Sequence, residues 1–225
     1  MESDYQIKEA GRAIISFSDS YTQNKQGKRN EQPDSDPTPS LVEISGYLQY
    51  LIDKIFDNNT RKQVIQIPKL LKSITTLSLY KIGIHIGQEL GQMRLEIRCN
   101  SRWCLFWIRL KGDEQDQSEL VNNGYGRVMS ISFSTAGGKG EEQDKEIRLG
   151  LRSIYWFLSE LHLGRNWQPS LQPLPLLARR TDEQMEEEGA REEIDAQMNN
   201  NGFDGNISVW ANEAKEATLN RFIQG

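Results

Sequence analysis

The fold prediction rests on residues Arg94 to Lys111, which read RLEIRCNSRWCLFWIRLK. Two alternating apolar runs meet across Asn100-Ser101-Arg102, which resembles a turn. Alternation places successive side chains on opposite faces of a strand and therefore predicts strands over 94–99 and 103–110. The second strand is apolar on both faces, which is typical of a central strand that is covered on both sides.

Two more strands complete the predicted sheet. Residues 127–134 alternate after a cluster of turn-forming residues at 122–126, and 82–86 alternates isoleucine with glycine and histidine. The acidic segment 112–119 is expected to be a loop. The sequence thus predicts an α+β fold in which helices pack on a mainly antiparallel sheet of about four strands.

Three segments have the apolar spacing of amphipathic helices. The first begins at Ser40, which forms a capping box with Glu43; the second spans 69–79; the third spans 141–161 and stops at Gly164. Their apolar positions are Ile44, Leu48, Leu51 and Ile55; Leu70, Leu71, Ile74 and Leu77; and Ile147, Leu151, Ile154, Leu158 and Leu161.

Composition divides the chain into four predicted regions. Polar residues and prolines predict a mostly disordered segment over 1–39, and an α+β core domain follows over 40–164. A strap rich in proline and leucine covers 165–178, and a charged helical arm covers 179–225.

Charge is unevenly distributed along the 225 residues, whose net charge is -5. The segments 54–81 and 94–111 are basic, whereas 179–198 is acidic. This pattern suggests an anionic partner for the core or an arm that competes with one, although ordinary solvated surface explains it equally. The two cysteines and the absence of a bilayer-length apolar run predict an intracellular protein, cytoplasmic or nuclear.

No catalytic, metal or cofactor motif emerges. Cys99 and Cys104 lack the partners and spacing of a zinc site, and His85 and His162 stand far from any paired nucleophile. The glycines of 137–140 lack the frame of a phosphate-binding loop and precede acidic residues that would repel phosphate. We therefore expect a protein that is not an enzyme and needs no cofactor or metal.

Two sets of residues are candidates for binding. Arginines interleaved with aromatic residues are typical of RNA-binding sheets, although the aromatic residues serve a core equally well. The predicted nucleic-acid-binding residues are Arg94, Arg98, Arg102, Arg109, Lys111, Lys69 and Lys72. Apolar anchors in the strap and arm form the second set, for a protein partner: Trp167, Leu171, Leu174, Leu176, Trp210 and Phe222.

These observations favour a non-enzymatic regulatory protein with a basic folded face and an acidic partner-binding tail. The first alternative is an RNA-binding protein that uses the basic, aromatic-containing sheet. The second is a peripheral structural protein that self-assembles on an anionic membrane surface, by physical analogy with viral matrix proteins.

Overall fold

The computed structural model describes residues 2–27, 38–82, 88–134, 144–202 and 205–219. Across these residues it contains eleven α-helices and no β-strand. The chain divides into two compact units, Met1–Leu110 and Lys111–Gly225. The predicted core domain, 40–164, spans parts of both units, and its boundaries stay a prediction.

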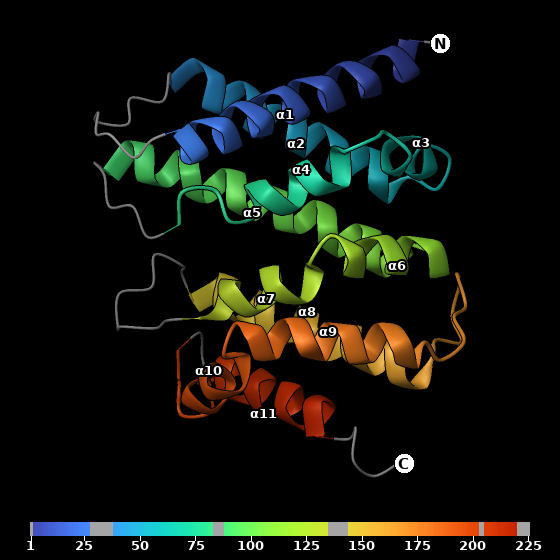
Figure 1. Cartoon of the computed structure of the whole chain (residues 1–225), viewed down its shortest axis with the longest axis vertical. Helices are drawn as coiled ribbons and strands as arrows, with labels where there is room; N and C mark the ends of the chain where they lie inside the picture. Colours follow the sequence, from blue (N-terminus) through green and yellow to red (C-terminus); the bar gives the residue numbers. More distant parts are fainter. Residues whose placement is uncertain (1, 28–37, 83–87, 135–143, 203–204, 220–225) are drawn as a thin grey trace. The chain divides into compact units, whose positions relative to one another are not determined.

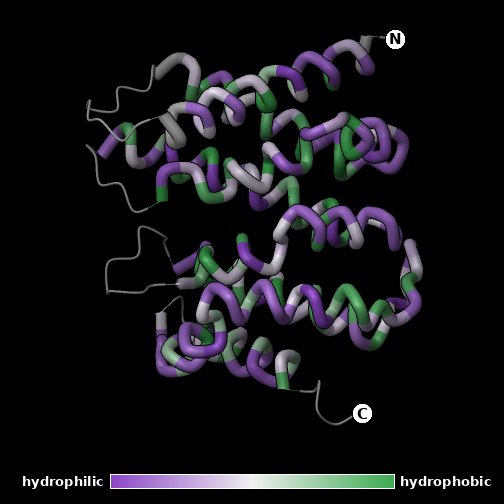
Figure 2. Tube along the Cα trace, viewed as in Figure 1, coloured by the Kyte–Doolittle hydropathy of each residue, from purple (hydrophilic) through white to green (hydrophobic). Residues whose placement is uncertain are grey.

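Unit 1 is built from the helices α1 to α5 (Figure 1). They are α1 (Glu2–Gly27), α2 (Thr38–Phe56), α3 (Arg61–Ile65), α4 (Leu70–Leu77) and α5 (Gln88–Lys111). Helix α1 packs against α2 and α4 and contributes Ile7, Ala10 and Ile14 to the core. Figure 2 shows hydrophobic and hydrophilic residues interspersed along the helices of unit 1, as amphipathic helices require.

Unit 2 contains α6 to α11, with α8 at its centre. They are α6 (Glu114–Asn122), α7 (Tyr125–Phe133), α8 (Asp144–Leu163), α9 (Pro175–Glu187), α10 (Ala190–Gln197) and α11 (Asn206–Leu219). Helix α8 packs against α7, α9 and α11. The acidic segment that follows the strap is therefore folded onto the rest of unit 2.

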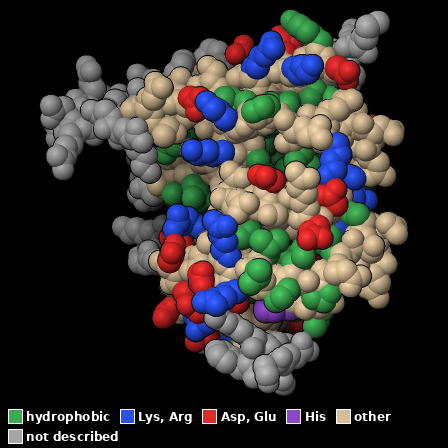
Figure 3. All heavy atoms as spheres, turned by 45° about the vertical axis from the view of Figure 1, so that its right-hand side comes forward, with side chains coloured by type: hydrophobic (Ala, Val, Ile, Leu, Met, Phe, Trp, Pro, Cys, Tyr) green, Lys and Arg blue, Asp and Glu red, His purple; other side chains and the backbone are tan. Residues whose placement is uncertain are grey.

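The surface of unit 2 pairs acidic with basic side chains. Arg127 contacts Glu187 at 2.6 Å and Glu188 at 2.7 Å, and Lys215 contacts Asp195 at 2.9 Å. Figure 3 likewise shows Lys and Arg side chains lying among Asp and Glu side chains on the face in view. Exposed pairs of this kind contribute little each, so apolar burial along α8 is the main source of stability.

The predicted α+β fold and its four-stranded sheet are wrong. Both segments of 94–110 belong to α5, 127–134 lies largely in α7, and the predicted loop 112–119 contains the start of α6. Along α5 the buried residues Ile97, Ser101, Cys104 and Ile108 repeat at spacings of four, three and four, which is helical periodicity. The expected first strand, 82–86, lies almost wholly outside the described residues.

The predicted helices are confirmed with shifted ends. All the apolar positions expected for 40–56, 69–79 and 141–161 are buried in α2, α4 and α8. Helix α8 stops before Gly164, whose φ of 79° is the left-handed conformation expected there. Helix α2 begins at Thr38, so Ser40 lies inside the helix and not at its N-cap.

Two other boundaries differ from the expectation. Helix α1 occupies much of the segment 1–39 that was predicted to be mostly disordered, because Ile7, Ala10 and Ile14 bury an apolar stripe that polar neighbours obscure in the sequence. In the predicted charged helical arm, the acidic segment 179–198 contains two helices, α9 and α10, which are separated at Gly189, whose φ is 64°.

Candidate functional site

Helices α2 and α5 lie side by side in the same direction. The Ser45 hydroxyl of α2 donates a hydrogen bond to Glu96 Oε1 at 2.7 Å and accepts one from Asn100 Nδ2 at 3.0 Å. One turn further on, the Cys104 thiol donates to the Leu48 carbonyl at 3.7 Å. The two helices are therefore held together by specific polar contacts as well as by apolar burial.

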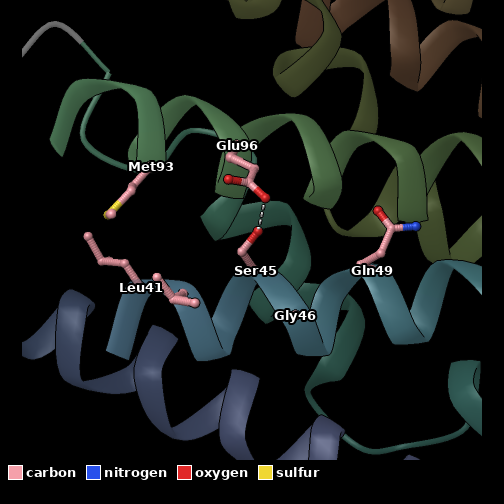
Figure 4. Close-up of a pocket in the computed structure, with 7 residues that line it drawn as sticks. Leu41, Ser45, Gly46, Gln49, Met93 and Glu96 are labelled. Carbon is pink, nitrogen blue, oxygen red and sulfur yellow. Dashed lines mark hydrogen bonds between the residues drawn. The ribbon is translucent and has the colours of Figure 1, made fainter. Parts of the chain in front are cut away.

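An open groove runs between these two helices. It has a volume of about 320 Å³ and is lined by Leu41, Val42, Ser45, Gly46 and Gln49 of α2 and by Met93 and Glu96 of α5. Figure 4 shows Leu41 and Met93 facing each other across one end, with the Ser45–Glu96 hydrogen bond beyond them. One lining residue, Val42, has 56% of its surface exposed, so this part of the groove presents apolar surface to solvent.

Gly46 keeps the middle of the groove open. A methyl group added at its Cα would meet nothing within 4 Å other than its chain neighbours and the backbone of its own helix. Glycine in a helix interior destabilises it by about 1 kcal/mol relative to alanine, and packing does not require the glycine here. The absent side chain therefore has one visible consequence, which is the space in the groove.

An aromatic cluster lies further along the same pair of helices. The Phe56 ring at the end of α2 meets the Trp107 ring of α5 edge-on, with their centroids 4.9 Å apart. Phe106 and Trp103 complete the cluster, at 5.2 Å from Trp107 and 5.1 Å from Phe106, respectively. Phe56 is 53% exposed and the other three rings are half-buried, so the cluster is partly open to solvent.

The predicted nucleic-acid-binding residues are distributed over different environments. Arg94, Arg98, Arg102 and Arg109 form one stripe of α5, and each has at most 2% of its surface exposed. Arg98 donates to the Tyr80 carbonyl at 3.2 Å, and the Arg109 guanidinium lies 5.3 Å from the centroid of Phe106. Lys111 is half-buried, whereas Lys69 and Lys72 are exposed near the start of α4. The stripe is therefore enclosed by protein and has almost no surface to offer a phosphate backbone.

Arg165 organises the strap in unit 2. Its guanidinium contacts Glu160 at 3.2 Å and donates to the carbonyls of Gly112 and Pro169, each at 2.6 Å. Its backbone forms an antiparallel bridge with Leu171, with both hydrogen bonds at 2.8 Å. The strap is thus fixed against the end of α8 through one buried arginine.

The predicted partner-binding residues do not form one surface. Trp167 is 45% exposed and packs on the Arg165 guanidinium, whereas Leu171 is buried and Leu174 is half-buried. Leu176 is 82% exposed at the start of α9. Trp210 of α11 is half-buried, 5.8 Å from the ring of Tyr155, and Phe222 lies outside the described residues.

Two side chains have a shifted pKa, Cys104 in unit 1 and Tyr155 in unit 2. Burial raises the pKa of the Cys104 thiol, which lies in the α2–α5 contact. Burial and, next, the charge of Glu213 raise the pKa of the Tyr155 phenol. Within the described residues, no three His, Cys, Asp or Glu side chains gather closely enough to hold a metal ion.

The helices of the described segments include none with the length and apolar content needed to cross a bilayer. No protein-family model matches the chain, and no curated protein matches it. Among solved structures, a designed armadillo repeat protein is 12% identical over 84% of this chain and 96% of that chain, with a TM-score of 0.26. So low a TM-score carries no argument about fold or function.

Sequence reasoning missed every residue that lines the groove. Val42 and Met93 read as ordinary apolar positions, and Glu96 reads as the polar face of a strand. Gly46 was the one available signal, because a glycine inside an otherwise regular helix needs a reason.

Proposed function

We propose that this is a non-enzymatic protein-interaction protein that binds a segment of a partner in the α2–α5 groove. The open groove at Gly46, between an exposed valine and a partly exposed aromatic cluster, is the observation that supports this function. Apolar surface that is concave and unfilled is favourable to bury, and clustered aromatic residues are frequent anchors of interfaces. The burial of the four α5 arginines gives the RNA-binding alternative no comparable support.

We also propose that the protein acts inside the cell. Its two cysteines are both free, Cys104 in the buried helix contact and Cys99 half-buried on the same helix. Free buried thiols are typical of reducing compartments, which is consistent with the composition of the chain.

The groove is tested by filling it without disturbing the fold. Gly46→Leu places a side chain in the open space and improves helix propensity, so the variant is expected to be at least as stable as the wild type. Gly46→Ala is the matched control, because it improves propensity similarly but adds only a methyl group.

A displayed library of random 16-residue segments is selected on the immobilised full chain, and enriched clones are then compared on the three proteins. We expect clones that bind the wild type and Gly46→Ala but lose at least tenfold in affinity for Gly46→Leu. A selection in which every binder tolerates Gly46→Leu would overturn the proposed function.

A further inference from the structure

We infer that the segment bound in the α2–α5 groove is a basic amphipathic helix, with apolar anchors on one face and Lys or Arg beside them. This inference rests on the proposed function and specifies the chemistry of the partner. It is carried by two independent features, which are the spacing of the residues along the groove and the charges at its edges.

The spacing suits a third helix. On α5 the groove side continues through positions separated by four, three, four, three and four residues, which are Glu89, Met93, Glu96, Asn100, Trp103 and Trp107. A repeat of this kind forms a continuous seam along a helix, and seams of this kind pack against other helices. The α2 side extends from Leu41 to Phe56, about 22 Å at the rise of an α-helix, so a helix of about 15 residues would span it.

A helix also suits the groove chemically. Its backbone groups bond within the helix, and it therefore needs only side-chain contacts from its site. The apolar contacts available are Leu41, Val42 and Met93 at one end and the Phe56–Trp107 pair at the other. Apolar anchors that repeat every three or four residues along the bound helix, over about 14 residues in all, would reach both ends.

The charge along the groove is negative. Glu96 is the one charged residue among those that line it, and it is an exposed residue although one carboxylate oxygen accepts the Ser45 hydrogen bond. Helical spacing places two more exposed carboxylates on the same faces, Asp53 one turn beyond Gln49 and Glu89 one turn before Met93. The one lysine of α2, Lys54, lies over the Tyr50 ring at 5.1 Å, on the opposite side of that helix.

The only cation in register with the groove is Lys111, one turn beyond Trp107 at the aromatic end of the described part of α5. An acidic helix would thus meet three carboxylates, whereas a basic helix would pair with them. Electrostatic complementarity of this kind selects partners by sign and raises association rates.

Two labelled 15-residue peptides provide the test. They share leucines at spacings of three and four, and their remaining positions carry lysine in one peptide and glutamate in the other. Binding to the full chain is followed by fluorescence anisotropy at low salt. We expect saturable binding of the lysine peptide, at least tenfold tighter than that of the glutamate peptide.

Three variants separate groove binding from general attraction to an acidic protein. Gly46→Leu keeps the net charge and is expected to abolish binding. Glu96→Gln is expected to weaken binding by about threefold to tenfold, as removal of one interfacial charge does. Glu43→Gln, which makes the same change on the exposed opposite side of α2, is expected to have no effect.

Each contrary result is informative. Lysine-peptide binding that survives Gly46→Leu, or falls equally for Glu43→Gln and Glu96→Gln, would overturn the inference. If neither peptide binds while library clones still require an open groove, the partner chemistry is wrong and the proposed function stands. Self-association of the wild type that Gly46→Leu abolishes, measured by sedimentation, would make a second copy of this chain the occupant and would also overturn the inference.

Discussion

Gly150→Ala is expected to destabilise unit 2, although alanine is the better helix former. Gly150 lies in α8 where this helix approaches α7 closely. A Cβ atom there would overlap the Ser132 hydroxyl oxygen and lie 3.3 Å from both the Met129 carbonyl oxygen and the Phe133 ring. Ser132 is buried and donates to the Met129 carbonyl at 2.7 Å, so moving its hydroxyl away from the new Cβ atom would break this hydrogen bond.

The expected change in the free energy of unfolding combines one stabilising contribution with two destabilising ones. Helix propensity favours alanine by about 1 kcal/mol. Overpacking costs about 1–3 kcal/mol, and a buried hydroxyl left without its hydrogen bond costs about 1–3 kcal/mol. We therefore expect Gly150→Ala to lower the free energy of unfolding by about 3 kcal/mol.

The measurement is urea unfolding followed by far-UV circular dichroism, with hydrogen exchange to locate the loss in α7 and α8. Gly46→Ala is the matched control, and it is expected to raise stability by about 1 kcal/mol because its methyl group meets nothing. Adding Ser132→Ala to the Gly150→Ala chain removes the overlapping oxygen and is expected to recover more than half of the loss. A Gly150→Ala protein as stable as the wild type would refute the close approach of α7 and α8.

Three further outcomes are expected. Arg165→Met removes a buried guanidinium that pairs with a carboxylate and donates to two carbonyls, so it should lower the free energy of unfolding by about 3–5 kcal/mol. Urea unfolding measures this loss, and a loss below about 1 kcal/mol would contradict the role of Arg165 in fixing the strap. The raised pKa of Tyr155 means that its contribution to stability is complete below pH 10 and falls as the pH rises through the folded-state pKa. An ultraviolet titration of wild type against Tyr155→Phe should show this late phenolate, and Glu213→Gln should shift it to lower pH. Iodoacetamide should label Cys104 only after unfolding, so equal labelling of Cys99 and Cys104 in the native protein would count against its burial.

Helices with one continuous apolar stripe were predictable from the sequence. The positions Leu48, Leu51 and Ile55 of α2, like Ile147 and Leu151 of α8, repeat at helical spacing and are all buried. In such segments the hydrophobic pattern and the tertiary packing require the same face. The predicted ends were less accurate: Ser40, which was expected to cap α2, lies inside that helix.

The hydrophobic pattern of α5 did not indicate a helix, because this helix is covered on more than one side. Its stripe of buried arginines looks polar, and its aromatic residues Trp103, Phe106 and Trp107 add apolar positions on the opposite side. An alternating pattern then fits as well as a helical one. Asn100, part of the stretch that resembled a turn, lies inside the helix and holds the contact with α2 through its hydrogen bond to Ser45.

The two glycines Gly46 and Gly150 are equivalent in sequence, since each interrupts an otherwise regular amphipathic helix at the same cost in propensity. Structure separates them. The close contact with Ser132 requires a glycine at position 150, so packing offsets the helix propensity that Gly150 loses. Gly46 has open space around it and no packing that needs a glycine. A local cost that the fold leaves uncompensated is a signal of function in natural sequences. This difference, which only three-dimensional contacts reveal, is the reason for placing the binding site at Gly46.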